Sequence, residues 1–167
     1  MYDELTEVDI KKMQEEIDHR VRVLRPQLIE EVQTARAFGD LSENFEYKCA
    51  KQAKNRNESR IRYLTNMIKT ARIIEDHSVA GEVGLFDKVT LYLEEDDETM
   101  VVQVCTTVRT DPCSGFISKE SPLGSAILGR RAGDRVTVHV NDRYSYDVEI
   151  RAIEKSEDDG SAPLLSY

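Results

Sequence analysis

The sequence predicts an α+β protein in which an N-terminal antiparallel α-helical hairpin of the coiled-coil kind precedes a C-terminal antiparallel sheet with a short helix. Two long stripes of apolar residues, spaced three or four apart, occupy the first half of the chain. After His77 the apolar residues alternate instead, in short runs rich in β-branched and aromatic side chains. Because a helix repeats every 3.6 residues and a strand every two, this switch of period predicts a hairpin over residues 1–77 and a sheet domain over residues 78–167.

The first apolar stripe predicts one long helix, the first arm of the hairpin, because its members recur at the spacing of a single helix face. They are Ile10, Met13, Ile17, Val21, Leu24, Leu28, Val32 and Ala35. Pro26 lies within this stripe and has no N–H to donate to the carbonyl of Arg22. We therefore expect a kink or a break near Arg25.

A second stripe with the same spacing predicts the returning arm. Its members are Ala50, Ala53, Asn57, Ile61, Leu64, Ile68, Ala71 and Ile74. Between the two stripes, Gly39 supplies a helix stop and Asp40 an acidic helix start. Residues Gly39–Glu43 are therefore predicted to form the tip of an antiparallel hairpin.

The tip sequence GDLSENFEY, residues 39–47, has two interpretations. Asp40 as N-cap, with Glu43 three residues later, has the spacing of a capping box, in which each side chain binds a backbone N–H at the helix start. Alternatively, carboxylates at an exposed tip can hold a hard divalent cation such as Mg²⁺, which prefers oxygen ligands. Capping motifs are far commoner than metal sites, so the local spacing alone favours the cap.

Four segments after His77 predict one antiparallel sheet, because each is rich in β-branched or aromatic residues and is bounded by turn-forming clusters. They are Lys88–Glu94, Met100–Thr107, Arg135–Asn141 and Tyr144–Ile153. Between the second and the third, SPLGSAILG predicts a short helix with Ser121 as N-cap and Pro122 at the first helical position. The segment Asp76–Gly84 is the predicted linker, and the polar end of the chain after Lys155 is expected to fray.

Composition and charge narrow the classes of function. The chain is 40% hydrophobic and 33% charged, as in a globular protein. Its sequence predicts neither a signal peptide nor a membrane span, so we expect a cytoplasmic location. Three cysteines without C-x-x-C spacing favour free thiols over disulfides or zinc. Residues 78–167 hold 9 basic against 17 acidic side chains, which makes autonomous DNA binding unfavourable and a protein partner more plausible.

Five stretches that together span nearly the whole chain resemble bacterial transcript cleavage factors of the GreA/GreB family. They are Leu5-Thr6, Arg25-Pro26, ARAFGDLSENFEY at Ala35–Tyr47, Glu58–Asp76, and SPLGSAILG. The resemblance implies an N-terminal coiled coil and a C-terminal FKBP-like domain. It also implies that the second domain docks at the rim of the secondary channel of RNA polymerase, while the coiled coil reaches through the channel to the active centre.

The same resemblance implies a role for particular residues. Asp40 and Glu43 would help the polymerase to retain a second Mg²⁺ in its active site and thereby stimulate cleavage of backtracked transcripts. The protein would be an accessory factor rather than an enzyme, with no cofactor of its own. Glu120, Ser121 and Pro122 would dock on the polymerase, although Glu120 stands where many relatives have Asp.

A basic zone near the tip also has two interpretations. Lys and Arg on a helix commonly only face water, whereas the resemblance implies contacts with the 3′ end of the nascent RNA or with the channel. The zone consists of Arg36, Lys48, Lys51, Lys54 and Arg56, and its scatter favours the GreA-like branch. Phe45 and Tyr47 can be staples between the arms or aromatic contacts, and we interpret Phe45 as structural and Tyr47 as functional.

The partners implied are RNA polymerase and, within that complex, the 3′ end of nascent RNA, with no membrane and with the protein as a monomer. Two alternatives stay open: an inhibitor that enters the same channel without stimulating cleavage, and a coiled-coil interaction adaptor that makes no use of its tip. The intact Asp40 and Glu43 favour stimulation. An FKBP-like fold also suggests prolyl isomerase activity, but the chain has no Trp and few aromatic residues after His77 to line such a pocket.

Overall fold

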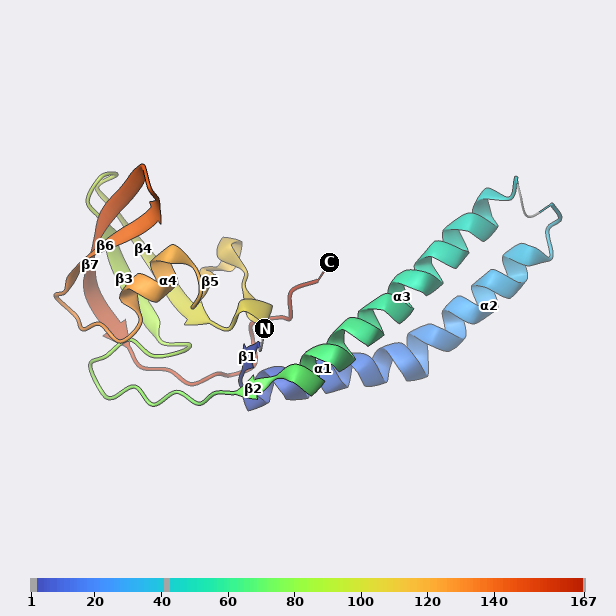
Figure 1. The fold of residues 1–167 in the computed structure, drawn as a ribbon, viewed down its shortest axis with the longest axis horizontal. Coiled ribbons are helices and arrows are strands. Elements are labelled where there is room, and N and C mark those ends of the chain that lie inside the picture. Colours follow the sequence, from blue (N-terminus) through green and yellow to red (C-terminus); the bar gives the residue numbers. More distant parts are fainter. Residues whose placement is uncertain (1–2, 41–42, 167) are drawn as a thin grey trace. The chain divides into compact units, whose positions relative to one another are not determined.

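A computed structural model describes residues 3–40 and 43–166, and it confirms the predicted order of a helical hairpin followed by a sheet with a short helix (Figure 1). The chain divides into two compact units. The helical unit comprises Ile10–Arg72 together with Asp3, and the sheet unit comprises Glu4–Asp9 together with residues 73–166. Within residues 3–40 and 43–166, no helix is both long and apolar enough to cross a membrane.

The first arm of the hairpin is helical throughout, although its middle is irregular. It consists of α1 (Glu7–His19), a π-helical segment (Arg20–Leu24) and α2 (Arg25–Arg36). Near Arg25, where a kink or a break is expected, the helix is irregular in the form of this π-helical segment, but it does not break. Instead, the N–H of Arg25 donates to the carbonyl of Arg20, five residues earlier, so the turn before Pro26 is wide. A wide turn gives the proline ring room that an α-helical turn would deny it, and the helix continues.

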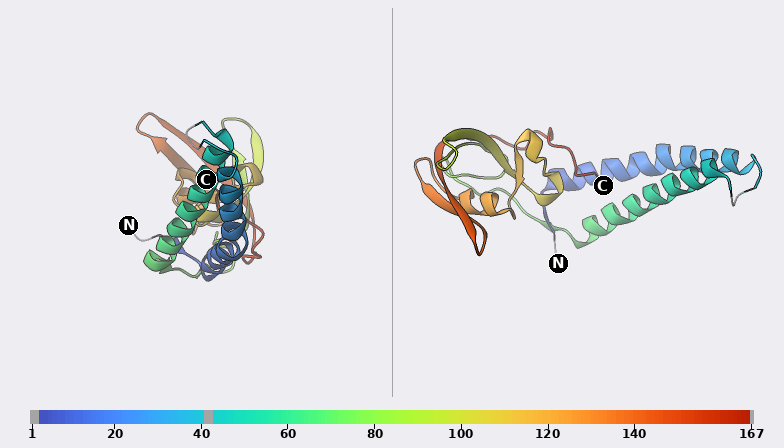
Figure 2. Two further views of the ribbon diagram at one scale, coloured as in Figure 1. Left: turned by 90° about the vertical axis from the view of Figure 1, so that its right-hand side faces the viewer. Right: turned by 90° about the horizontal axis from the view of Figure 1, so that it is seen from above.

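The second arm, α3 (Phe45–Thr70), runs antiparallel to α1 and α2 in every view (Figures 1 and 2). The prediction that this helix extends to Ile74 is wrong, because Ala71 is already extended, with φ −62° and ψ 136°. Two short strands, β1 (Glu4–Leu5) and β2 (Arg72–Ile73), pair there instead. The N–H of Ile74 donates to the carbonyl of Leu5 at 2.9 Å, so strand pairing satisfies backbone groups that further helix would have used.

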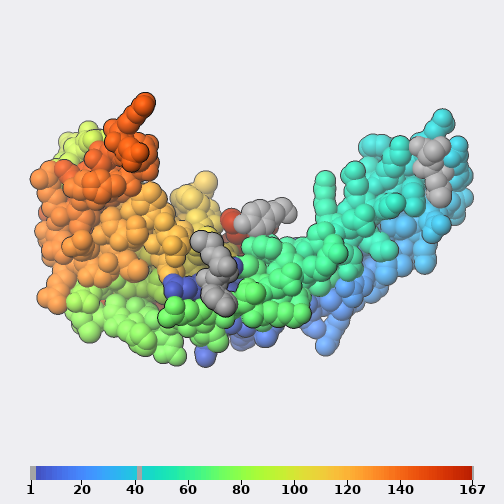
Figure 3. Space-filling model, viewed as in Figure 1, coloured from blue at the N-terminus to red at the C-terminus, as the bar shows by residue number. Residues whose placement is uncertain are grey.

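A polar seam joins the arms at the π-helical segment. Asn57 is buried in α3, where its amide nitrogen donates to the carbonyl of Arg20 and its amide oxygen accepts from the guanidinium of Arg20. Nearby, Arg25 and Glu58 form a two-bond ion pair at 2.7 and 2.9 Å. In the space-filling view the atoms of the two arms touch along the hairpin (Figure 3). The polar seam explains why the apolar stripe contains an Asn, since a buried amide must find hydrogen-bond partners.

The sheet unit contains the four predicted strands, each antiparallel to its neighbours among the four, and one more. They are β3 (Lys88–Leu93), β4 (Glu98–Cys105), β6 (Arg135–Asn141) and β7 (Tyr144–Glu154); with the additional β5 (Phe116–Ser118), the sheet order is β5-β4-β3-β7-β6. The additional strand is parallel to β4, so the sheet is mixed. Its three residues are too few to show an alternating pattern in the sequence.

The core of this unit lies on one face of the sheet. Val89, Leu91, Val104 and Ile150 have no exposed surface. Ile127 belongs to the same cluster and comes from α4 (Pro122–Ile127), which confirms the predicted short helix. Two 3₁₀ turns, η2 (Thr107–Arg109) and η3 (Pro112–Ser114), connect β4 to β5.

The expectation that the end of the chain frays is wrong. Ala162 is 1% exposed, and the N–H of Leu165 donates to the carbonyl of Val108 at 2.7 Å. The hydroxyl of Ser156 donates to the carbonyl of Phe86. The terminal segment therefore packs on the sheet unit although its sequence is polar, because its backbone finds partners there.

Candidate functional site

The hairpin tip is built by a helix end that only glycine completes easily. After α2, the N–H groups of Ala37 and Phe38 donate to the carbonyls of Thr34 and Ala35, which closes the last turn. Gly39 follows with φ +115°, in the region that L side chains rarely adopt. This residue turns the chain out of the helix and leads directly into the acidic residues of the tip.

The start of α3 corrects the capping prediction. The N-cap is Asn44, whose side-chain oxygen accepts the N–H of Tyr47 at 3.0 Å, so the predicted box with Asp40 as N-cap and Glu43 at N3 is wrong. Asn is as good an N-cap as Asp, and its amide nitrogen adds a bond to the carbonyl of Ala35 at 2.7 Å. One side chain therefore begins the second arm and ties it to the end of the first.

Asp40 and Glu43, the two predicted catalytic-assistance residues, are both exposed at the tip. Leu41 and Ser42, which separate them in the sequence, lie outside the described residues. Within residues 3–40 and 43–166, no group of three or more His, Cys, Asp or Glu side chains is arranged to hold a metal ion. Two exposed carboxylates nevertheless fit Mg²⁺ as part of a ligand set, because this ion prefers oxygen ligands and commonly takes only one or two carboxylates from a protein.

The predicted basic zone divides by exposure. Among its cations, Lys54 is half-buried, whereas the others are exposed; these are Arg36, Lys48, Lys51 and Arg56. The side chain of Tyr47, which lies in the same region, is half-buried. Exposed cations on the first turns of α3 and the last turn of α2 give the tip region positive charge that can meet a polyanion.

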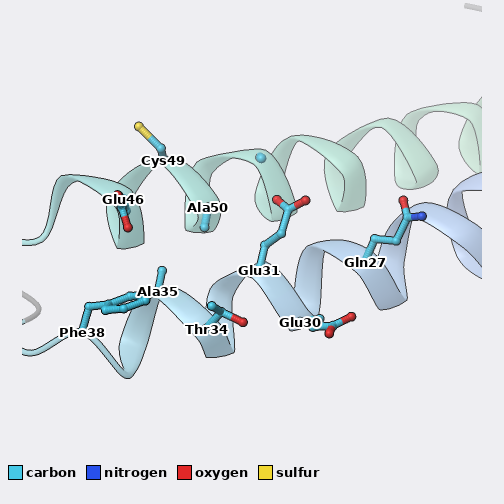
Figure 4. Close-up of a pocket in the computed structure, with 10 residues that line it drawn as sticks. Gln27, Glu30, Glu31, Thr34, Ala35, Phe38, Glu46, Cys49 and Ala50 are labelled. Carbon is cyan, nitrogen blue, oxygen red and sulfur yellow. The ribbon is translucent and has the colours of Figure 1, made fainter.

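A groove of about 900 Å³ lies between the two arms near the tip (Figure 4). Small residues, among them Ala35, Ala50 and Ala53, line it, because side chains of this size leave space between the arms. Figure 4 shows Phe38 and Glu46 near the tip end of the groove and Gln27 toward the other end. The remaining lining residues include Glu30 and Glu31, so the groove is acidic where the outer surface of α3 is basic.

The predicted docking residues lie in the sheet unit, at the start of α4. The hydroxyl of Ser121 accepts the N–H of Gly124 at 3.0 Å and donates to the carbonyl of Ser118 at 2.6 Å, so Ser121 is the N-cap, as predicted. Pro122 occupies the first turn and is exposed. A Cβ atom on Gly124 would lie 2.1 Å from the carbonyl oxygen of Ser118, so glycine is required for this close approach. Glu120 is exposed and lies 3.4 Å from the ammonium of Lys119.

An apolar groove of about 330 Å³ borders Ser121 and Pro122. Its other walls include Ile117, Leu123 and Tyr146, and the exposed Val140 lies at its edge. The capping geometry thus presents Pro122 beside an apolar depression, which suits contact with a protein surface.

Two features of the tip differ from the predictions. The cap is Asn44, and the sequence carries a signal for it, because Asn44 directly precedes the helix and is a residue type that favours this position. The prediction that Phe45 is a staple between the arms is wrong, because its side chain is 76% exposed. For Phe45 the sequence carries no such signal, because the residues of the first helical turn point in all directions around the helix.

Comparison with known proteins assigns the chain to a family. A model of the N-terminal part of GreA/GreB-type transcription elongation factors matches residues 4–73, and a model of the GreA/GreB C-terminal part matches residues 78–155. Transcription elongation factor GreA of Mesoplasma florum is 39% identical over 147 residues, which are 87% of this chain and 94% of that protein. The GreA of Bacillus licheniformis is 38% identical over 135 residues, 80% of this chain and 85% of that one.

Among solved structures, GreA factor homolog 1 (Gfh1) of Thermus thermophilus is similar at 25% identity, covering 93% of this chain and 100% of that one with a TM-score of 0.42. The two family models and the relatives at 38–39% identity, which the alignments cover over most of their length, show that this chain belongs to the GreA/GreB family of transcription elongation factors.

Proposed function

We propose that this protein binds RNA polymerase through the secondary channel and stimulates the polymerase's own cleavage of backtracked transcripts, with Asp40 and Glu43 as the assisting residues. The observation that carries the proposal is that both carboxylates are exposed at the tip while the N-cap of α3 is a different residue, Asn44. The tip acids are therefore not explained as the helix cap. Exposed carboxylates at the end of a long hairpin suit chemistry in another protein's active site.

The residues of the chain have separable tasks in this proposal. Asp40 and Glu43 offer carboxylate oxygens as ligands and as acceptors for the hydrogen atoms of an attacking water. Gly39 and Asn44 hold the backbone on either side of them, through the positive φ of Gly39 and the bond from Asn44 to Ala35. When bound in the polymerase active site, Mg²⁺ supplies a Lewis acid that stabilises the attacking and leaving oxygens.

The remaining predicted residues support binding rather than chemistry. The exposed Lys48, Lys51 and Arg56 can neutralise phosphates of extruded RNA, and Arg36 lies on the opposite arm. Ser121 and Pro122, beside the apolar groove, are the proposed contact with the polymerase. The protein is an accessory factor, and the scissile bond and the principal metal site belong to the polymerase.

The test uses backtracked elongation complexes and the full-length protein. Asp40→Asn and Glu43→Gln keep the shape of each side chain but remove its charge, so both are expected to reduce stimulated cleavage strongly at limiting Mg²⁺. Binding, measured by competition with the labelled wild-type protein, is expected to stay within about twofold, because neither substitution alters the proposed docking residues or the cations near the tip. Glu46→Gln is the matched control, because Glu46 lies in the first turn of α3 and lines the groove between the arms. It removes one carboxylate close to the tip without touching Asp40 or Glu43.

Near-normal cleavage by both Asp40→Asn and Glu43→Gln across a Mg²⁺ titration would overturn the role of the tip acids. Binding by the wild-type protein that slows elongation without any cleavage would mark it instead as an inhibitor of the same channel. Loss of binding by Pro122→Asp, with an unchanged circular dichroism spectrum, supports the docking contact.

A further inference from the structure

Phe38 and Phe45 have the most exposed large hydrophobic side chains among the residues the structure describes. Phe38 is 72% exposed and Phe45 is 76% exposed, on either side of the tip acids. Burying a phenylalanine side chain stabilises a folded protein, and in this structure neither ring gains much of that stabilisation. A hairpin that served only as a spacer would gain nothing from two aromatic rings in water.

The side of α3 that carries Phe45 also carries cations. Residues three, seven and eleven positions after it lie along the same side of α3, and they are Lys48, Gln52 and Arg56. All four side chains are exposed. At about 1.5 Å per residue this strip is roughly 16 Å long, and it carries an aromatic ring at its tip end followed by two cations and an amide.

The surroundings of Phe38 differ. Its ring lines the groove between the arms, where the charged lining residues are Glu46, which lies at the same end as Phe38, and Glu30 and Glu31, which lie further along the groove (Figure 4). Carboxylates repel a phosphate backbone, so an RNA strand is not expected to enter there. The two phenylalanines are therefore similarly exposed, but the strip of α3 that carries Phe45 holds cations, whereas the charged residues that line the groove beside Phe38 are acidic.

We propose that Phe45 stacks on a base of single-stranded RNA whose phosphates are held by Lys48 and Arg56. The inference rests on the proposed function, because it requires the extruded 3′ segment of a backtracked transcript to reach the tip. An aromatic side chain next to cations is the combination by which proteins hold single-stranded nucleic acid, since every base has a flat face and every nucleotide a phosphate. Stacking does not depend on base identity, so Phe45 serves transcripts of any sequence.

The position of Phe45 also suits this task mechanically. It is the first residue of α3, directly after the cap Asn44, so its backbone is fixed by the bonds that Asn44 makes to Tyr47 and Ala35. A ring on a fixed backbone, with only two side-chain torsions, loses little entropy when it stacks. The neighbouring Glu43 would then lie close to the nucleotides that follow the stacked base.

The experiment measures the factor concentration that gives half-maximal cleavage of backtracked complexes. The extruded RNA carries either ordinary bases or one abasic nucleotide, placed at each extruded position in turn. Phe45→Ala is expected to raise that concentration about tenfold on ordinary RNA, within the range that loss of one stacked base produces, and Phe45→Trp to restore it. Phe38→Ala, the matched control in the acidic groove, is expected to change it less than twofold.

With an abasic nucleotide at the stacked position, the half-maximal concentration of the wild-type protein is expected to rise to that of Phe45→Ala. The half-maximal concentration of Phe45→Ala itself is expected to stay the same. A loss by Phe45→Ala that is equally large with an abasic nucleotide at every position would overturn the proposal, because the ring would then contact the polymerase. Wild-type behaviour of Phe45→Ala would overturn it as well.

A binding experiment separates this inference from the proposed function. The same proteins and RNAs are compared by competition binding, and every protein also carries both Asp40→Asn and Glu43→Gln. Binding does not require cleavage, so the effect of Phe45 and of the abasic nucleotide is expected to persist there. If the wild-type protein fails to stimulate cleavage while this binding pattern holds, the catalytic role fails and the stacking contact stands. If cleavage is stimulated and the binding pattern is absent, only the stacking contact fails.

Discussion

The guanidinium of Arg109 lies 3.4 Å from the carboxylate of Asp9, and neither side chain has any exposed surface. The same guanidinium also pairs with Asp158 and donates through Nε to the carbonyl of Ala162 at 3.0 Å. It lies 4.6 Å from the centre of the Phe86 ring. One buried cation thus joins the start of α1, the turn after β4 and the terminal segment.

Asp9 has a second task in this cluster. Its other carboxylate oxygen accepts the N–H of Thr6 at 2.9 Å, and the hydroxyl of Thr6 accepts the N–H of Asp9 at 3.2 Å. This is the reciprocal arrangement of a capping box, at the start of α1 rather than at the hairpin tip. The carboxylate therefore fixes where α1 begins and compensates the charge of Arg109.

Replacing Arg109 with Met is expected to lower the free energy of unfolding by about 3–5 kcal/mol, because it leaves buried carboxylates without a cation. Arg131→Met is the control, since Arg131 forms an exposed ion pair with Glu82 that is expected to contribute less than about 1 kcal/mol. Urea unfolding followed by circular dichroism measures both. Equal losses in the two variants would contradict a structural role for the buried cluster.

Deleting residues 157–167 is expected to destabilise the sheet unit, because Arg109 would lose Asp158 and the carbonyl of Ala162 together. The expected loss is about 2 kcal/mol or more, the scale of leaving a buried charged donor unsatisfied. Thermal unfolding of the full-length and shortened chains measures it, with Ser166→Ala, at an exposed position, as the control. An unchanged midpoint would mean that the terminal segment packs without stabilising.

The sequence predicted the features that local periodicity encodes. The two stripes gave the hairpin, alternation gave four strands, and Ser121-Pro122 gave α4, because each of these depends on residues a few positions apart. The Arg109 cluster could not be predicted in this way, since its partners lie 100 and 49 positions away. The prediction of the N-cap of α3 was wrong for a different reason. Asp and Asn are both favoured N-cap residues, so the residue type does not distinguish Asp40 from Asn44, and only the folded backbone selects Asn44.

Asn44 is expected to stabilise the hairpin tip through both of its side-chain bonds. Asn44→Ala should lower the free energy of unfolding of the tip by about 0.5–2 kcal/mol, the range for lost N-caps. Asn44→Asp keeps the acceptor for Tyr47 and removes the donor to Ala35, so it should retain much of the cap but loosen the link between the arms. Amide hydrogen exchange in the first turns of α3 measures both effects, and unchanged exchange in Asn44→Ala would contradict the capping role of Asn44.

The three free thiols are expected to differ in reactivity. Cys49 and Cys113 are exposed, whereas Cys105 is buried, and burial raises the pKa of its thiol to about 11. Because the thiolate is the reactive form, Cys105 should not react at pH 8 in the folded protein. Counting labelled thiols by mass spectrometry should give two before unfolding and three after it. Rapid labelling of Cys105 in the native protein would show that the sheet core opens readily.

Glu16 is expected to make the stability of the hairpin depend on acid pH. Its carboxylate accepts from the guanidinium of Arg20 at 2.7 Å and from that of Arg60 at 2.9 Å. Burial alone would raise the pKa of Glu16, but the hydrogen bonds from Arg60 and Arg20 outweigh it and hold the pKa below its usual value of 4.5. The folded state therefore binds this proton less readily than the unfolded state does.

It follows that Glu16 contributes its full stabilisation above about pH 4.5 and loses it as the pH falls through the lower, folded-state pKa. Glu16→Gln should destabilise the hairpin at pH 7 and reduce the fall in stability between pH 5 and pH 3. The fall should not vanish, because hydrogen bonding to Arg25 likewise lowers the pKa of Glu58. Hydrogen exchange in α3, measured at increasing urea across this pH range, gives the slope of the unfolding free energy against pH. The control is Glu15→Gln, at an exposed position. A slope that Glu16→Gln leaves unchanged would mean that the ion pairs of Glu16 do not persist in solution.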